Sequence, residues 1–337
     1  MAHAAPTATP AAGGAPRVLG FDAIAALLEG LPLVDAMEAG FVAYSRGDAN
    51  VPPVGELLLP GGECHIKHGT IRGHPHYVVK VASGFPGNPA LGLPAANGLM
   101  LLFDASTGAA VAVLLDRGLL TDARTAAAGA LAARLLAPDR PDGSGAIGIV
   151  GTGAQARFQA RWLLGVTSER RLRCWGRSAA KAQRLAEELR GIGFDAAASP
   201  DLGEMMAASS LVVTTTNAED PLILPEHLHP GLHVTAIGSD AAHKQELHAG
   251  VLAEADAVVV DSRAQAALRG EVHRAVAAGT LSMERVVEIG EVAAGTRPGR
   301  IDERSVTVAD LTGLAVQDLQ IASAVVSADR AAQEPPP

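Results

Sequence analysis

The chain has 337 residues, of which 48% are hydrophobic and 19% charged, and its formal net charge is -9. A chain of this length and composition can bury a large core and is long enough for two domains. The negative charge argues against a nucleic-acid partner, for which a basic surface would be expected, and favours a small-molecule ligand. We therefore expect a soluble globular protein that binds a small molecule and no nucleic acid.

Both ends of the chain are predicted to be disordered, because residues 1–16 are rich in Ala, Pro, Thr and Gly and residues 331–337 end in three prolines. The first segment lacks the basic and apolar regions of a secretory signal, and no apolar run is long enough to span a membrane. Cys64 and Cys174 are too few for a disulfide framework or a metal cluster. These features predict a cytoplasmic protein without a membrane partner.

The first third of the chain is expected to form an α+β unit. Helical patterns cover residues 21–28 and 34–45. Strand-like runs separated by turn residues follow at residues 55–59, 64–71, 76–83, 99–103 and 110–115. An Ala-rich helix at residues 122–136 would lead from this unit to the next.

A glycine motif follows an apolar strand at residues 146–150 and opens a helical pattern. Its residues are Gly151, Thr152, Gly153, Ala154, Gln155 and Ala156. The first glycine permits a tight turn, the second lets the backbone approach a pyrophosphate, and the alanine allows close packing of helix on strand. The new helix N-terminus offers unpaired N–H groups to an anion. Because the context is right on both sides, the motif predicts a dinucleotide site rather than a plain strand-to-helix turn.

The end of the next strand, at residues 172–175, indicates which dinucleotide is bound. NAD enzymes usually place Asp or Glu there to hold the ribose 2′-hydroxyl, and this chain has neither. Arg177 and Ser178 would suit a 2′-phosphate, so NADP(H) is the preferred cofactor and NAD(H) is possible. The alternative is that both residues only begin the following helix, since Ser is a favoured N-cap.

Helix and strand patterns alternate after the motif, with a helix at residues 179–190 and strands at 211–214, 233–237 and 257–260. This order is typical of a doubly wound parallel sheet. A last strand at 305–309 and a helix at 314–328 are expected to return to the first domain. The predicted fold is therefore α/β, with a Rossmann domain at residues 126–305 inserted in an α+β domain formed by residues 17–125 and 306–330.

Five segments, at residues 77–89, 120–127, 151–156, 236–247 and 310–313, match one family in the order they occur. Together they resemble the ornithine cyclodeaminase/mu-crystallin family over about residues 20–328. Residues 63–67 and 97–100 look most like the branch that contains ectoine-utilisation proteins. The resemblance implies a homodimer whose first domain, with the C-terminal helix, forms the dimer interface and substrate wall, beside a Rossmann domain across an active-site cleft.

Members of this family interconvert amino acids and imines by hydride transfer at the carbon that bears nitrogen. The resemblance therefore implies an NAD(P)H-dependent imine or ketimine reductase, equivalent in reverse to an amino-acid dehydrogenase. Two alternatives stay open. The first is an ammonia-releasing cyclodeaminase that uses the cofactor transiently, and the second is a non-catalytic protein of the mu-crystallin type that binds NADPH and a small ligand.

Three residues are assigned to substrate and catalysis. Lys80 sits in an apolar strand, where its ammonium needs a partner that a substrate carboxylate could supply. Arg124 begins the Ala-rich helix and could grip the same carboxylate. Asp240, at the carboxyl edge of the sheet, resembles the family's catalytic aspartate, which exchanges protons with the substrate nitrogen. The competing interpretations are a snorkelling lysine, a solvent-facing arginine and an N-cap aspartate.

Further residues are assigned to the cofactor, the strand-end residues from their position and Thr312 and Gly313 because they resemble the family's loop that closes on the cofactor. They are Thr125 beside Arg124, the strand-end residues Thr214, Thr215 and Thr216, Gly238, and the late loop residues Thr312 and Gly313. The histidines show no metal-ligand spacing, so no metal is expected.

The chain departs from the ornithine-cyclising pattern of the family. Those enzymes carry an arginine for the substrate carboxylate where this chain has Val54-Gly55-Glu56, and their glutamate for the distal amine aligns with Glu63, His65 or Lys67. Ornithine is therefore in doubt as substrate. If Lys67 points into the cleft, it would repel a distal ammonium and suit a second carboxylate, as in an iminosuccinate-like substrate.

Overall fold

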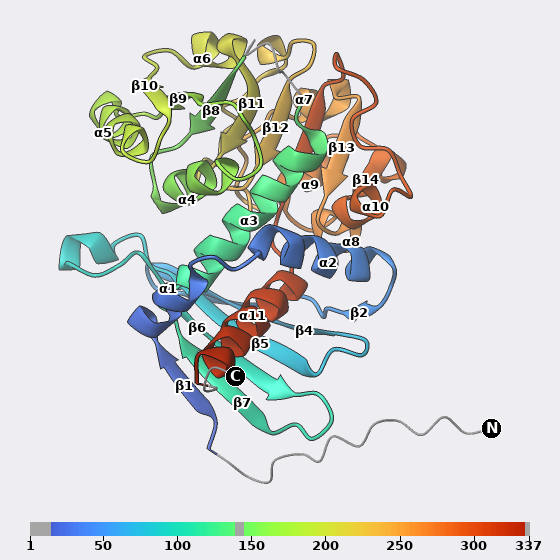
Figure 1. The fold of residues 1–337 in the computed structure, drawn as a ribbon. Coiled ribbons are helices and arrows are strands. Elements are labelled where there is room, and N and C mark those ends of the chain that lie inside the picture. The colour runs from blue at the N-terminus through green and yellow to red at the C-terminus, as the bar shows by residue number, and fades with distance from the viewer. Residues whose placement is uncertain (1–14, 139–144, 334–337) are drawn as a thin grey trace.

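The computed structural model describes residues 15–138 and 145–333, and their strands form one seven-stranded and one eight-stranded sheet. The helix α3 (Leu119–Leu136) connects the two sheets and runs between them (Figure 1). The ends predicted to be disordered lie mostly outside the described residues, but residues 331–333 are an exception because they continue the last helix, α11 (Ala315–Gln333). None of the described helices combines the length and apolar character needed to cross a membrane.

The first sheet is antiparallel except where β1 pairs with β7. Its strands are β1 (Arg17–Gly20), β2 (Ala49–Asn50), β3 (Gly55–Leu59), β4 (Gly62–Ile71), β5 (His76–Gly84), β6 (Ala96–Asp104) and β7 (Ala110–Leu115). The helices α1 (Phe21–Leu28), α2 (Leu33–Ser45) and α11 pack on this unit (Figure 1). Apart from the short strands β1 and β2, each element was predicted to within a few residues.

The second sheet is entirely parallel, in the order β10-β9-β8-β11-β12-β15-β13-β14. Its strands are β8 (Ala146–Val150), β9 (Arg171–Trp175), β10 (Asp195–Ala198), β11 (Ser209–Thr214), β12 (His233–Ala236), β13 (Ala257–Val260), β14 (Val286–Glu288) and β15 (Thr307–Asp310). Its helices are α4 (Ala154–Leu163), α5 (Ala179–Arg190), α6 (Leu202–Ala208), α7 (Ala249–Glu254), α8 (Arg263–Ala266), α9 (Gly270–Ala277) and α10 (Ile289–Ala293). The central strands are buried on both faces, as the near-continuous apolar runs require. The predicted doubly wound Rossmann fold is confirmed.

The position predicted for the last strand is wrong. β15 does not join the first sheet but lies between β12 and β13, near the middle of the second. The pattern Thr307-Val308-Ala309 indicates a buried strand but carries no information on which sheet it enters, and both sheets can accept a parallel strand. The helix that follows, α11, does pack on the first sheet, against β4 and β5. The domain boundary expected at residue 305 therefore assigns β15 to the wrong domain. The other domain boundaries stay predictions.

Candidate active site

The turn after β8 has the geometry that a dinucleotide requires. Gly151 has φ +117°, and a side chain there would lie 2.5 Å from the Thr215 hydroxyl oxygen. Gly153, the N-cap of α4, has open space where a Cβ atom would be, so a pyrophosphate can approach the helix N-terminus. Ala156 is fully buried between helix and strand. The residues of this turn fit a dinucleotide.

A cavity of about 770 Å³ extends from this turn along the carboxyl edge of the sheet. Its walls include these predicted cofactor residues: Gly151, Thr152, Gly153, Arg177, Ser178, Thr215 and Thr216. Ser178 is also the N-cap of α5, because its hydroxyl accepts a hydrogen bond from the Lys181 amide at 3.4 Å. Lys181 lines the same cavity, so two cations, Lys181 and Arg177, lie at the end where a ribose phosphate would be bound.

A second cavity, of about 640 Å³, lies between the two sheets and shares Asn217 and Glu219 with the first. Its walls bring together these predicted residues: Lys67, Arg124, Thr125, Gln155, Asp240 and Thr312. The remaining predicted residues line neither cavity: Lys80, Ala154, Ala156, Thr214, Gly238 and Gly313. Segments from both sheets thus meet around one space large enough for a small molecule and adjoining the dinucleotide pocket.

The partner of Lys80 in this structure is a protein carboxylate. Its ammonium donates a hydrogen bond to Asp318 Oδ1 of α11 at 3.0 Å, and Arg124 Nε forms an ion pair with the same oxygen at 3.2 Å. All three side chains are almost completely buried. Burial, followed by repulsion from Arg124, lowers the pKa of Lys80 to about 8, whereas Asp318 opposes this change. Lys80 therefore lies beneath the cavity, and the carboxylate of Asp318 stabilises its charged form.

Lys67 lies on the cavity wall and connects the two halves of the molecule. Its ammonium donates to the carbonyl oxygens of Thr312 at 3.1 Å and Gly313 at 2.7 Å. Burial, together with repulsion from Lys80 and Arg124, lowers the pKa of Lys67 to about 7. Two of its three N–H donors are thus engaged with the loop between β15 and α11, and one is left for a ligand.

Asp240 follows β12 and faces the cavity from the Rossmann side. Its side chain is 43% exposed and accepts a hydrogen bond from Lys244 Nζ at 2.7 Å. Burial would raise the pKa of Asp240, but the ammonium of Lys244 outweighs it and lowers this pKa below its ordinary value. Asp240 is therefore a carboxylate at neutral pH.

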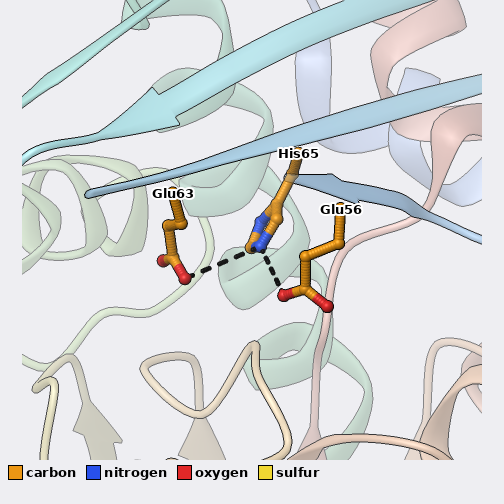
Figure 2. Close-up of side chains that lie close together, drawn as sticks. All are labelled: Glu56, Glu63 and His65. Atoms are coloured by element: carbon orange, nitrogen blue, oxygen red, sulfur yellow. Dashed lines mark hydrogen bonds and ion pairs between the residues drawn. The ribbon is translucent and has the colours of Figure 1, made fainter. Parts of the chain in front are cut away.

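One group of residues in the described part of the chain has an arrangement that could hold a metal ion. Figure 2 shows the carboxylates of Glu56 and Glu63 turned toward the ring of His65, at 3.1 Å and 3.8 Å from Nε2. Glu56 and His65 are directly opposite each other on β3 and β4, so the group contains a cross-strand hydrogen-bonded pair. Glu63 and His65 also line the second cavity.

Sequence reasoning missed two residues of the site. Asp318 is separated from Lys80 by 238 positions, and no local pattern connects them. Lys244 lay within a matched segment, and its spacing of four residues from Asp240 was a usable signal.

The fold and these cavities define a two-domain Rossmann protein with a ligand cleft at the domain boundary. A family model for the ornithine cyclodeaminase/mu-crystallin family matches residues 18–333, and the chain belongs to that family. An uncharacterised cyclodeaminase of Sinorhizobium fredii is 43% identical over 298 residues, covering 87% of this chain and 89% of the relative.

Two further relatives have defined activities in their names. The iminosuccinate reductase of Paracoccus denitrificans is 33% identical over 90% of this chain and 93% of its own. Its solved structure, in complex with NAD+, has a TM-score of 0.86 over 94% of this chain and 97% of that one. An archaeal alanine dehydrogenase dimer with bound NAD is 30% identical, with a TM-score of 0.86 over 95% and 98% of the two chains.

These findings confirm the family and support a nicotinamide cofactor and an oxidoreductase of amino or imino acids. The finer placement near ectoine-utilisation proteins and the preference for NADP(H) stay predictions.

Proposed function

We propose that this protein is an NAD(P)H-dependent imine or ketimine reductase that acts on the C–N bond of a small amino or imino acid. The observation that carries the proposal is the second cavity, where Arg124 and Lys67 face Asp240 beside the dinucleotide pocket. Two cations suit a carboxylate, and a carboxylate on the opposite wall suits a protonated nitrogen. An imino acid carries both groups.

Each residue then has a defined task. Arg124 binds the substrate carboxylate from the cavity wall, while Asp318, which is also paired with Lys80, holds its guanidinium in place from behind. Asp240, which is ionised, stabilises the iminium form of the substrate, because a positive nitrogen makes the adjacent carbon a better hydride acceptor. The cofactor, when bound, supplies the hydride. In the reverse direction, hydride leaves the neutral amine, and Asp240 accepts the proton that the resulting iminium gives up.

The proposed substrate class is a 2-imino acid with a second acidic group. Lys67 lines the cavity and retains one donor, and it would repel a distal ammonium. The similarity to an iminosuccinate reductase supports the same class.

NADP(H) is the proposed preferred cofactor, with NAD(H) as the alternative. Arg177 and Lys181 line the dinucleotide pocket, and β9 ends without an acidic residue that could hold a ribose 2′-hydroxyl. The relatives with bound NAD show that the family framework also accepts NAD.

A homodimer is proposed because apolar side chains are exposed on the first domain, among them Leu58 with 80% of its surface accessible. The others in this region are Leu57, Leu59, Leu91 and Leu93. A cytoplasmic location is proposed as well. Light scattering of the purified protein tests the dimer.

The activity is tested by a screen of 2-oxo acids with ammonia or methylamine, and of cyclic imines, with each reduced cofactor. A reductase consumes the reduced cofactor in equal amount to product. Ammonia release from a diamino acid without net cofactor oxidation would instead identify a cyclodeaminase. Binding of the cofactor and of substrates without any turnover would identify a ligand-binding protein.

A further inference from the structure

Glu246 is a buried acid that none of the steps above uses. It lies in the loop before α7 and is completely shielded from solvent. Its carboxylate accepts four hydrogen bonds, each between 2.6 and 2.8 Å. The donors are the hydroxyl of Thr214, the amide and hydroxyl of Thr216, and the amide of Gly238.

These donors come from two separate segments, the end of β11 with the loop after it, and the loop after β12. Oε1 accepts both bonds from Thr216, in the loop after β11 that lines the dinucleotide pocket. Oε2 accepts the bond from Gly238, two residues before Asp240, and a bond from Thr214. One rigid carboxylate thus joins the loop of the cofactor pocket to the loop that carries Asp240.

The main chain of Glu246 is itself fixed. Its amide donates to Glu271 Oε1 at 2.7 Å, and its carbonyl oxygen accepts bonds from the amides of Leu222 and Ile223. A Cβ atom at Gly238 would lie 2.7 Å from the Glu246 carboxyl group, so the second loop packs directly on it. Lys244, two residues earlier, holds Asp240. The segment 244–246 therefore contacts Asp240 directly through Lys244, and it contacts Gly238, two residues before Asp240, through Glu246.

We propose that Glu246 is a positioning residue that sets the placement of Asp240 relative to the bound cofactor, and so the geometry of hydride transfer. This proposal rests on the proposed function. Its physical basis is that hydride transfer needs donor and acceptor carbon atoms close together, and an error of about 1 Å costs about 10²-fold in rate.

The variant Glu246→Gln tests this directly. An amide has one acceptor oxygen and one donor nitrogen, so it can accept from the main-chain N–H of Thr216 or of Gly238 but must oppose the other. We expect kcat to fall about 10²-fold, while the dissociation constant of the reduced cofactor changes much less. The primary isotope effect with 4-deuterated cofactor should rise, because misplacement makes hydride transfer rate-limiting.

Two further variants complete the test. Thr214→Val removes a single donor and should lower kcat about threefold to tenfold, which provides a measurable effect if the Gln variant does not fold. Glu254→Gln, at the exposed end of α7, is the matched control and should leave kcat and the isotope effect unchanged. Wild-type kcat and isotope effect in Glu246→Gln, or losses explained entirely by a lower folded fraction, would overturn the proposal.

Failure of the proposed function is a different result. If the wild-type protein turns over no imino acid, hydrogen exchange of the cofactor-bound variants replaces kinetics. Loss of protection confined to residues 214–217 and 237–240 would support the positioning role, and unchanged protection there would refute it.

Discussion

Lys67 of β4 and Lys80 of β5 are directly opposite each other in the first sheet, so their side chains share one face of it. Like charges in this position repel, and both lysines are buried. The structure compensates them unequally, because Lys80 contacts the carboxylate of Asp318, whereas the hydrogen bonds of Lys67 within the described part of the chain go to two backbone carbonyl groups. This difference makes Lys67 the group that gives up its proton more readily.

The affinity for a carboxylate substrate should fall as pH rises. Burial lowers the pKa of Lys67 to about 7 and of Lys80 to about 8, and each ammonium loses its charge as pH passes its pKa. We expect log(1/KM) to be constant below this window and to decrease above it. The guanidinium of Lys67→Arg stays charged up to about pH 12. This variant should therefore lose the decrease in log(1/KM) that begins near pH 7. An unchanged profile in that variant would show that Lys67 does not bind substrate.

Asp318→Asn should move this loss of affinity to lower pH. The Asp318 carboxylate raises the pKa of both Lys67 and Lys80, so its neutralisation lowers both. At pH 8 we expect KM for the substrate to rise by at least about tenfold. Asp329→Asn, on the same helix but paired with Arg17, is the matched control and should not move the profile.

Asp240→Asn should lower turnover by about two to four orders of magnitude, the scale for loss of a positioned acid or base. Cofactor binding should remain, because Asp240 lines the cavity between the sheets rather than the dinucleotide pocket. Stopped-flow turnover and fluorescence titration measure the two quantities. A variant with nearly full activity would contradict the assignment.

Lys244→Met should shift the acid limb of the kcat profile to higher pH. Lys244 holds the pKa of Asp240 below its ordinary value, and the carboxylate form is the active one, so activity is lost as pH falls through this pKa. Without the ammonium, the pKa of Asp240 should rise by about one unit or more. An acid limb at the same pH in the variant and the wild-type protein would show that Lys244 does not set the pKa of the catalytic carboxylate.

Arg177→Asp should reverse the cofactor preference. Loss of one charge-assisted contact costs about 1.5 to 3 kcal/mol, or one to two orders of magnitude in NADPH affinity. NADH should be weakened less or bound more tightly. Arg184→Asp, on the exposed side of α5, controls for the change in net charge. Equal wild-type affinity for the two cofactors would refute the preference for NADP(H).

Local patterns in the sequence were sufficient for much of the site. The glycine turn from Gly151 to Ala156 and the carboxyl-edge position of Asp240 follow from the alternation of strands and helices, which is a short-range property. The same patterns placed Arg124 in the first turn of a helix, whereas the structure begins α3 at Leu119 and puts Arg124 in the second turn.

Long-range pairings could not be predicted in the same way. Lys80 was expected to pair with a substrate carboxylate. Its partner in the structure is Asp318, on a helix near the other end of the described chain. β15 was assigned to the wrong sheet for the same reason, because strand patterns do not specify neighbours. In both cases the contact joins segments far apart in the sequence, and the hydrophobic periodicity of one segment says nothing about the other.

The late position of β15 in the chain has a consequence for folding. Residues 307–333 supply an inner strand of the parallel sheet and then the helix that covers the antiparallel one. Until this segment is available, β12 and β13 lack the strand that pairs with both, and Lys80 lacks its counter-ion. Neither half can therefore reach its final form before residues 307–333 have been synthesised. Both must mature together, through a few contacts of very large sequence separation, which slow folding and prolong exposure of apolar strands.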